Sequence, residues 1–241
     1  MKSLVFVHGY LGGGLQWADQ VEIFAAHFRV ITPDLPGFGE NHTMTTPETI
    51  RELAQYVLGE LDKLEVDRFH LVGHSMGGMI VQEMVALAPE RVDKLVLYGT
   101  GPVGIMPGRF ETIDESRRGV KEKGVEETGR RIAATWFQDG ESASGYRVCA
   151  ELAVKASLQA ALAGLSAMES WSGVSALPKI ASSTLVLWGD GDRAYLWNQP
   201  EQLWREIAGA HLAVIPGCSH AVHLEKPHLF NAMLLDFLGT S

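Results

Sequence analysis

The sequence has few of the features that would place it in a specialised class of protein. It contains only two cysteines, Cys149 and Cys218, far apart and with no CxxC pair, so neither a disulfide-stapled miniprotein nor a cysteine-rich zinc module is expected. No uninterrupted apolar stretch approaches the roughly 20 residues that a membrane span requires. The short apolar run at residues 4–7 is too brief for a signal peptide. We therefore expect a soluble, cytoplasmic protein without a membrane partner.

Positive charge is also scarce. Lys and Arg number 20 against 29 Asp and Glu, which gives a formal net charge of -9. An acidic surface has no general attraction for phosphate backbones, so no nucleic-acid partner is expected. The chain is long and apolar enough, at 241 residues and 46% hydrophobic, to bury a core without disulfides or metals.

Short runs rich in Val, Ile and Leu alternate with helical patterns, and Gly, Pro or Asp bounds each run. Such runs are typical of parallel strands buried on both faces. The predicted strands are residues 4–7, 30–32, 69–72, 95–98, 184–188 and 212–215. An apolar face over 50–64 predicts a helix entered through Thr46 as N-cap and Pro47 as first residue, and another helix ends at Pro89. The fold class is α/β, a mostly parallel sheet flanked by helices, with ligands at the carboxyl ends of the strands.

The alternation breaks between residues 102 and 178, where helical segments at 128–137 and 148–168 occur without a convincing strand. We interpret 102–178 as a helical insertion that caps the sheet, and 1–101 with 179–241 as the core. The charged stretch 111–127 is typical of a solvated helix face.

The strongest chemical signal is the G-x-S-x-G pattern centred on Ser75, between a predicted strand and a predicted helix. In that context the pattern forms a nucleophile elbow, a tight strained turn that presents the serine oxygen at a helix N-terminus. Glycine is needed on both sides, because side chains at Gly73 or Gly77 would collide with neighbouring backbone. Ser75 is therefore the candidate nucleophile.

A serine hydroxyl is a poor nucleophile at neutral pH, so it needs a base, an orienting acid and donors for the oxyanion. Asp192 and His220 each follow a predicted strand and supply the acid and the base, in the chain order Ser, Asp, His. The backbone N–H groups of Tyr10 and Met76 are the candidate oxyanion hole. Asp190 competes with Asp192 as the acid, and its alternative role is to cap a turn through its side chain.

His223 and His228 compete with His220 as the base. A zinc site at His220, His223 and Cys218 lacks a well-spaced third ligand. Residues 12–14, Gly-Gly-Gly, do not complete a phosphate-binding motif. The sequence therefore predicts neither a metal nor a cofactor.

Five motifs together resemble the α/β-hydrolase superfamily, in particular its small carboxylesterase, enol-lactonase and meta-cleavage-product hydrolase branches. They are His8-Gly9, Asp34-Leu35-Pro36-Gly37-Phe38-Gly39, Gly73-His74-Ser75-Met76-Gly77-Gly78, Gly189-Asp190-Gly191-Asp192, and Gly217-Cys218-Ser219-His220 continuing to Pro227. The resemblance implies an α/β-hydrolase fold over nearly the whole chain, with a cap at 102–178. It also matches Ser75, Asp192 and His220 to the family's triad. Family members usually carry an antiparallel hairpin before the first strand, so we expect a sheet shortened at that edge.

Aromatic and basic residues of the insertion give weaker signals. Trp136 is the best candidate for a substrate-binding residue, and Phe137 and Trp171 are further candidates for the lining of an apolar pocket. The alternative for all three is core packing between cap and sheet, the commoner role of aromatic residues on helices. We expect Arg109, Arg130 and Arg131 to lie at the surface and assign none of them to substrate binding.

The resulting hypothesis is a cofactor-independent serine hydrolase that cleaves a carboxylic ester or enol-lactone of a small, largely apolar substrate. Carbon–carbon bond hydrolysis of a dienoate is the alternative, because the same triad serves both, and perhydrolysis is a further variant. A small-molecule sensing module on the same scaffold is the alternative from another class.

Overall fold

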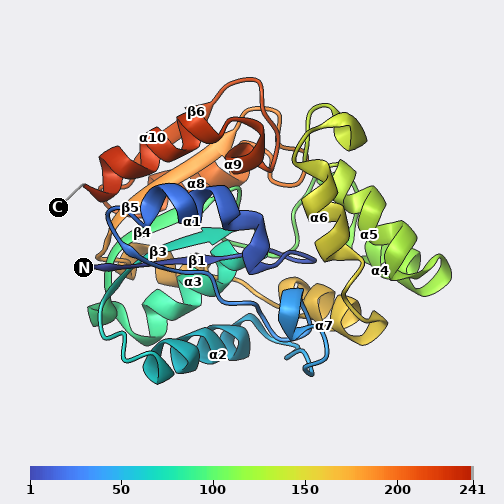
Figure 1. The fold of residues 1–241 in the computed structure, drawn as a ribbon, viewed down its shortest axis with the longest axis horizontal. Helices are drawn as coiled ribbons and strands as arrows, with labels where there is room; N and C mark the ends of the chain where they lie inside the picture. The colour runs from blue at the N-terminus through green and yellow to red at the C-terminus, as the bar shows by residue number, and fades with distance from the viewer. Residues whose placement is uncertain (240–241) are drawn as a thin grey trace.

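A computed structural model describes residues 1–239 of the chain, which form one parallel sheet covered by helices on both faces (Figure 1). The strands follow the order β2-β1-β3-β4-β5-β6, and every neighbouring pair is parallel. They are β1 Ser3–Val7, β2 Arg29–Ile31, β3 Phe69–His74, β4 Val92–Tyr98, β5 Ser183–Gly189 and β6 His211–Ile215. All six strands were predicted, and β2 is the edge strand beside β1, with no further strand outside it in residues 1–239.

The helices divide between the two faces of the sheet and the insertion. They are α1 Ala18–Phe24, α2 Ile50–Lys63, α3 Met76–Leu87, α4 Ile113–Glu122, α5 Gly124–Ala134, α6 Tyr146–Ala153, α7 Leu158–Glu169, α8 Asn198–Glu206, α9 Val222–Glu225 and α10 Pro227–Leu238. Alternate residues of β1 point to opposite faces, as strand geometry requires: Val5 belongs to the core cluster that also contains residues of α2, α3 and α8, and Phe6 to the cluster that contains residues of α1 and α10. The parallel strands are thus buried on both sides.

Two sequence expectations about helices were wrong. The N-cap of α2 is Thr49, whose side chain accepts a hydrogen bond from Glu52 N, and not Thr46, which is buried. A Thr with a Glu three residues later is the better capping pattern. The expected helix at 148–168 is instead α6 and α7, bent by 104° across residues 154–157. Ser157 caps α7 through its side chain, which is why the helix restarts there.

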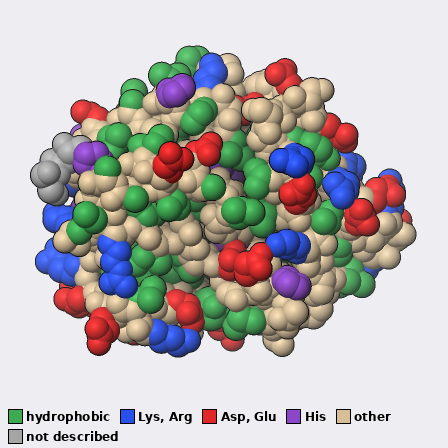
Figure 2. Space-filling view, viewed as in Figure 1, with side chains coloured by type: hydrophobic (Ala, Val, Ile, Leu, Met, Phe, Trp, Pro, Cys, Tyr) green, Lys and Arg blue, Asp and Glu red, His purple; other side chains and the backbone are tan. Residues whose placement is uncertain are grey.

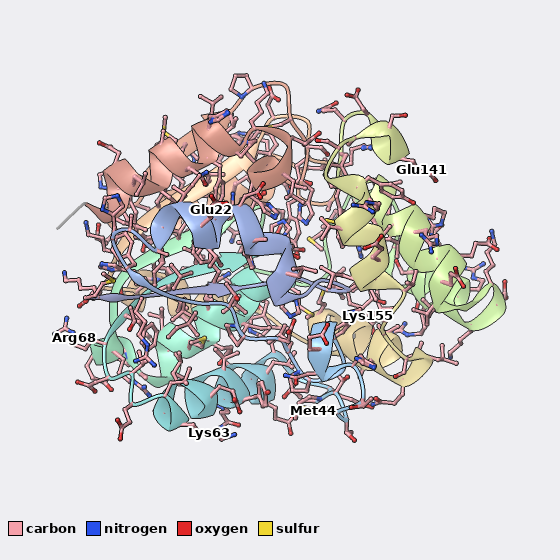
Figure 3. All side chains as sticks on the ribbon, viewed as in Figure 1. Glu22, Met44, Lys63, Arg68, Glu141 and Lys155 are labelled. Atoms are coloured by element: carbon pink, nitrogen blue, oxygen red, sulfur yellow. The ribbon has the colours of Figure 1, made fainter. Side chains whose placement is uncertain are left out.

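Helices α4 to α7 lie together at one end of the molecule, beyond the carboxyl ends of the strands (Figure 1). Backbone bonds pair the two ends of this insertion, because Gly173 N donates to Pro102 O at 2.8 Å and Gly104 N donates to Trp171 O at 3.1 Å. Lys155, in the bend between α6 and α7 (Figure 3), forms an ion pair with Glu40 of the core at 2.6 Å. The division at residues 102 and 178 stays a prediction.

The visible surface in Figure 2 intersperses basic and acidic side chains rather than separating them. No single helix in residues 1–239 has both the length and the apolar composition to cross a membrane. The bent pair α6 and α7 meets those criteria only when its two helices are taken together.

Candidate active site

Ser75 occupies a strained turn between β3 and α3. Its backbone has φ 59° and ψ -122°, a conformation that residues other than glycine rarely adopt. A Cβ atom on Gly77 would lie 2.3 Å from Val7 O, and one on Gly73 would lie 2.5 Å from Gly77 O. The expected need for glycine at both positions is confirmed, and the turn has the form of a nucleophile elbow.

The structure brings together Asp192, which follows β5, and His220, which follows β6. His220 Nδ1 lies 2.8 Å from Asp192 Oδ2, and both side chains are buried. The other carboxylate oxygen, Oδ1, accepts hydrogen bonds from Ala194 N at 2.7 Å and Tyr195 N at 3.1 Å. These two amides fix the carboxylate plane, so that Oδ2 can hold the proton of the imidazole on Nδ1.

None of the competing residues occupies an equivalent position. Asp190 Oδ1 accepts a hydrogen bond from Gly217 N at 2.7 Å, which makes it the turn-capping carboxylate anticipated as the alternative. His228 is exposed on α10. His223 is buried, with Nδ1 3.0 Å from Tyr98 Oη. Burial, followed by the nearby His220, lowers the pKa of His223 to about 3, so it is neutral and has no carboxylate partner to make it a base.

Two buried side chains, those of Tyr98 and His74, contact the backbone carbonyl of His220. The carbonyl accepts a hydrogen bond from Tyr98 Oη at 2.9 Å and lies 3.1 Å from His74 Nε2. Gln16 Nε2 lies 3.4 Å from His74 Nδ1, an arrangement in which Nδ1 accepts and Nε2 donates to the carbonyl. Burial keeps the pKa of His74 well below its ordinary value. A neutral, fixed ring therefore supports the loop that carries His220.

The loop after β1 lies directly against the elbow. A Cβ atom on Gly9 would come within 2.8 Å of Ser75 Cβ, so the backbone approaches the serine as closely as glycine allows. His8 anchors this loop by accepting from Leu35 N at 3.0 Å through Nε2 and contacting Gly9 O at 2.8 Å through Nδ1. Within residues 1–239, neither the Tyr10 amide nor the Met76 amide donates a hydrogen bond, which leaves both free for an oxyanion.

Ser75 and His220 line the same cavity under the insertion. It has a volume of only about 20 Å³. Its lining residues are Tyr10, Ser75, Met106, Arg109, Ile132, Trp136, Met168, Ala194, Tyr195 and His220. No hydrogen bond joins Ser75 Oγ to His220 in the described part of the chain, a contact that often forms only once substrate is bound. A space of this size holds about one water molecule, so substrate entry requires the wall to move.

Trp136, the expected substrate-binding residue, lies in this wall, with its ring centroid 6.2 Å from that of His220. The other two aromatic candidates do not line the cavity. Phe137 is fully buried in the core, and Trp171 donates its indole N–H to Glu83 at 3.1 Å. Two larger clefts, of about 480 and 460 Å³, adjoin Leu15 at the seam between core and insertion, and no triad residue lines them.

Sequence reasoning misplaced Arg109 and missed Tyr195. Arg109 was expected at the surface, but it lines the cavity that contains Ser75 and His220. The segment after β4 contacts the loop that carries Asp192, where Phe110 N donates to Arg193 O at 3.0 Å. Tyr195 stacks on His220 with 5.6 Å between ring centroids and 11° between planes. Its position three residues after Asp192 was the one signal that placed it near the site.

No three His, Cys, Asp or Glu side chains within residues 1–239 converge as a set of metal ligands. Cys218, considered with His220 and His223, instead donates its thiol to Ile215 O at 3.3 Å.

Known proteins that resemble this chain include several hydrolases. The sequence profile of the family described as "Alpha/beta hydrolase family" matches residues 4–233. A 2-hydroxy-6-oxononadienedioate/2-hydroxy-6-oxononatrienedioate hydrolase of Cupriavidus pinatubonensis is 31% identical over 252 residues, covering 99% of this chain and 87% of that protein. The enol-lactonase of Burkholderia xenovorans LB400 superposes with a TM-score of 0.89 at 24% identity, over 98% of this chain and 91% of the other. Est816, described as an N-acyl homoserine lactone degrading enzyme, gives 0.80 at 26% identity, over 98% and 93%.

Proposed function

Because this chain belongs to the alpha/beta hydrolase family, we propose that Ser75, His220 and Asp192 carry out its hydrolytic reaction on a carboxylic ester or enol-lactone. The expected fold and the expected hydrolase activity are confirmed by the family match and by the hydrolase relatives. The roles of the individual residues and the nature of the substrate are our proposal. The observation that carries it is the buried Asp192–His220 contact at 2.8 Å, beside a cavity that Ser75 also lines.

The reaction begins with proton transfer from Ser75 to His220 Nε2 as the serine oxygen attacks the substrate carbonyl. Asp192 keeps the other proton on Nδ1 and stabilises the imidazolium that forms. The carbonyl oxygen becomes an oxyanion, which the amides of Tyr10 and Met76 stabilise. His220 then protonates the leaving oxygen, which departs and leaves an acyl-enzyme on Ser75. A water molecule, deprotonated by the same imidazole, hydrolyses this ester and restores the enzyme.

The test is the hydrolysis of 4-nitrophenyl acetate by the wild-type protein and by the Ser75→Ala variant. We expect the substitution to lower kcat by about 10⁴-fold or more, because loss of a triad nucleophile removes the covalent route. A Ser75→Ala protein that is folded and hydrolyses the ester at the wild-type rate would show that the nucleophile lies elsewhere.

Hydrolytic carbon–carbon cleavage of a dienoate is the second candidate. It is favoured by the relative that is 31% identical and is named for the hydrolysis of 2-hydroxy-6-oxo dienedioates. The same serine, imidazole and oxyanion donors serve this reaction, so the residues alone do not rank the two substrates. Parallel measurement of kcat/KM for a short aryl ester and a chromogenic 2-hydroxy-6-oxo dienoate ranks them directly.

We also propose that the enzyme acts on its small-molecule substrate in a reducing compartment such as the cytoplasm. Cys149 and Cys218 are both buried and unpaired, as is usual where thiols are kept reduced. Fractionation of the producing cells, with antibody detection of the protein, tests this location.

A further inference from the structure

Arg109 has an unusual environment for a cation. The side chain lines the cavity that contains Ser75 and His220, yet its Nε and Nη1 atoms are buried without any hydrogen-bond partner in residues 1–239. Its guanidinium carbon lies 4.9 Å from the centre of the Phe110 ring, a contact that satisfies no N–H group. Buried guanidinium groups normally pair with carboxylates or other acceptors, since an unpaired N–H in a dry site is costly. The Nε and Nη1 groups of Arg109 can therefore donate hydrogen bonds to an acceptor that enters the cavity.

The acidic side chains around Arg109 are already engaged elsewhere. A cleft of about 260 Å³ lies on the other side of Arg109 and Met106, and its acidic residues are Glu111, Asp114 and Glu169. Glu111 forms an ion pair with Arg131 at 2.7 Å. Asp114 and Glu169 both pair with Arg117. No carboxylate within the described residues forms an ion pair with the Arg109 guanidinium, so the chain leaves its buried Nε and Nη1 atoms available to an acceptor on a bound molecule.

A second donor without an acceptor faces the same cavity. The Tyr195 hydroxyl is fully buried and forms no hydrogen bond of normal geometry in residues 1–239, although the Ser75 and Thr100 side chains lie close enough to lower its pKa. Burial raises the pKa of Tyr195 to about 12, against a smaller lowering by neighbours that include Ser75 and Arg109, so the phenol keeps its proton at neutral pH. A guanidinium and a phenol together supply a positive charge and several N–H and O–H groups. This combination matches the oxygens of a carboxylate better than those of a neutral group.

We propose that Arg109, assisted by the Tyr195 hydroxyl, binds a carboxylate of the substrate, so that the enzyme hydrolyses anionic esters or lactones in preference to neutral ones. This proposal rests on the assignment of Ser75 as the nucleophile. It also accounts for the small closed cavity. Arg109 and Met106 line both the cavity and the outer cleft and so form the wall between them, and an arriving carboxylate draws the guanidinium into a new arrangement.

The experiment compares 4-nitrophenyl hydrogen adipate, which carries a free carboxylate, with its methyl ester, in which a methyl group removes that charge. The quantity measured is the ratio of kcat/KM for the acid to that for the methyl ester. In Arg109→Met we expect this ratio to fall by about 10- to 100-fold, the usual effect of losing hydrogen bonds between charged groups. Arg109→Lys should give an intermediate ratio, because it keeps the charge without the planar group. Arg130→Met is the matched control, since Arg130 pairs with Glu126 on the surface and does not line the cavity.

A second measurement does not depend on turnover. A fluorophosphonate labels Ser75, and butyrate should slow this labelling more than butyramide does in the wild-type protein but not in Arg109→Met. Circular dichroism confirms that each variant is folded. Equal ratios in wild type and Arg109→Met, or an equal fall in Arg130→Met, would overturn the carboxylate site while leaving the nucleophile intact. Failure of Ser75 to react with the fluorophosphonate would instead overturn the proposed function, and this inference with it.

Discussion

Asp192→Asn changes a single atom of the site and should place the proton of His220 on the wrong nitrogen. The Oδ1 position must still accept from Ala194 N and Tyr195 N, so the new NH₂ group faces His220 Nδ1. Nδ1 then has to accept, and the proton moves to Nε2, the nitrogen that must take the proton from Ser75. Rotating the amide to restore the tautomer sacrifices two hydrogen bonds, about 3–6 kcal/mol in all.

That cost sets the size of the effect. At about 1.4 kcal/mol for each factor of ten, only one molecule in roughly 10²–10⁴ holds the productive tautomer, and kcat should fall by the same factor. The assay is steady-state hydrolysis of a 4-nitrophenyl ester, with thermal unfolding to confirm that the variant is folded. Asp190→Asn is the control, because an asparagine oxygen still accepts from Gly217 N. Asp192→Asn activity within tenfold of wild type would refute the reasoning, as would an equal loss in the control.

Three further predictions concern access, the oxyanion site and pH. Met106→Ala should enlarge the cavity of about 20 Å³ and raise kcat/KM for hexanoyl relative to acetyl esters; an unchanged ratio would place the entry elsewhere. Gly9→Ala puts a Cβ 2.8 Å from Ser75 Cβ. Because this contact displaces the elbow and the Tyr10 amide, kcat should fall by about 10²–10³-fold, and the crowding should also lower the melting temperature. The pKa of His223 is lowered to about 3, so the stability that its neutral form contributes is complete above pH about 6.5 and declines as pH falls toward 3. His223→Gln should therefore reduce the slope of unfolding free energy against pH, between 6.5 and 5, by up to about 1.4 kcal/mol per unit, and an unchanged slope would contradict this.

The fold was predictable, and the central residues of the candidate site could be named from the sequence, because both depend on local patterns. Buried parallel strands are continuous apolar runs, so every strand was found within a few residues of its observed ends. Ser75, Asp192 and His220 each follow such a strand, and parallel strands bring their carboxyl ends to one edge of the sheet. The contact between Asp192 and His220 follows from that topology.

The residues that shape the cavity were less predictable, because they depend on the path of the insertion. Arg109 lies in an irregular segment, which is joined to the loop that carries Asp192 by the bond from Phe110 N to Arg193 O. Periodicity carries no information about such a contact. The bend between α6 and α7 was also missed. The apolar pattern continues across residues 154–157, so periodicity alone does not reveal that the helix ends and restarts at the Ser157 cap.

The most direct test of the central claim is to trap the covalent intermediate and locate it. Wild-type protein is mixed with a 4-nitrophenyl ester, quenched in acid within milliseconds, digested and analysed by mass spectrometry. We predict an acyl group on the peptide that contains Ser75, formed in a burst of 4-nitrophenol release and strongly reduced in Asp192→Asn. An acyl group on another side chain, or an undiminished burst in Ser75→Ala, would contradict the account.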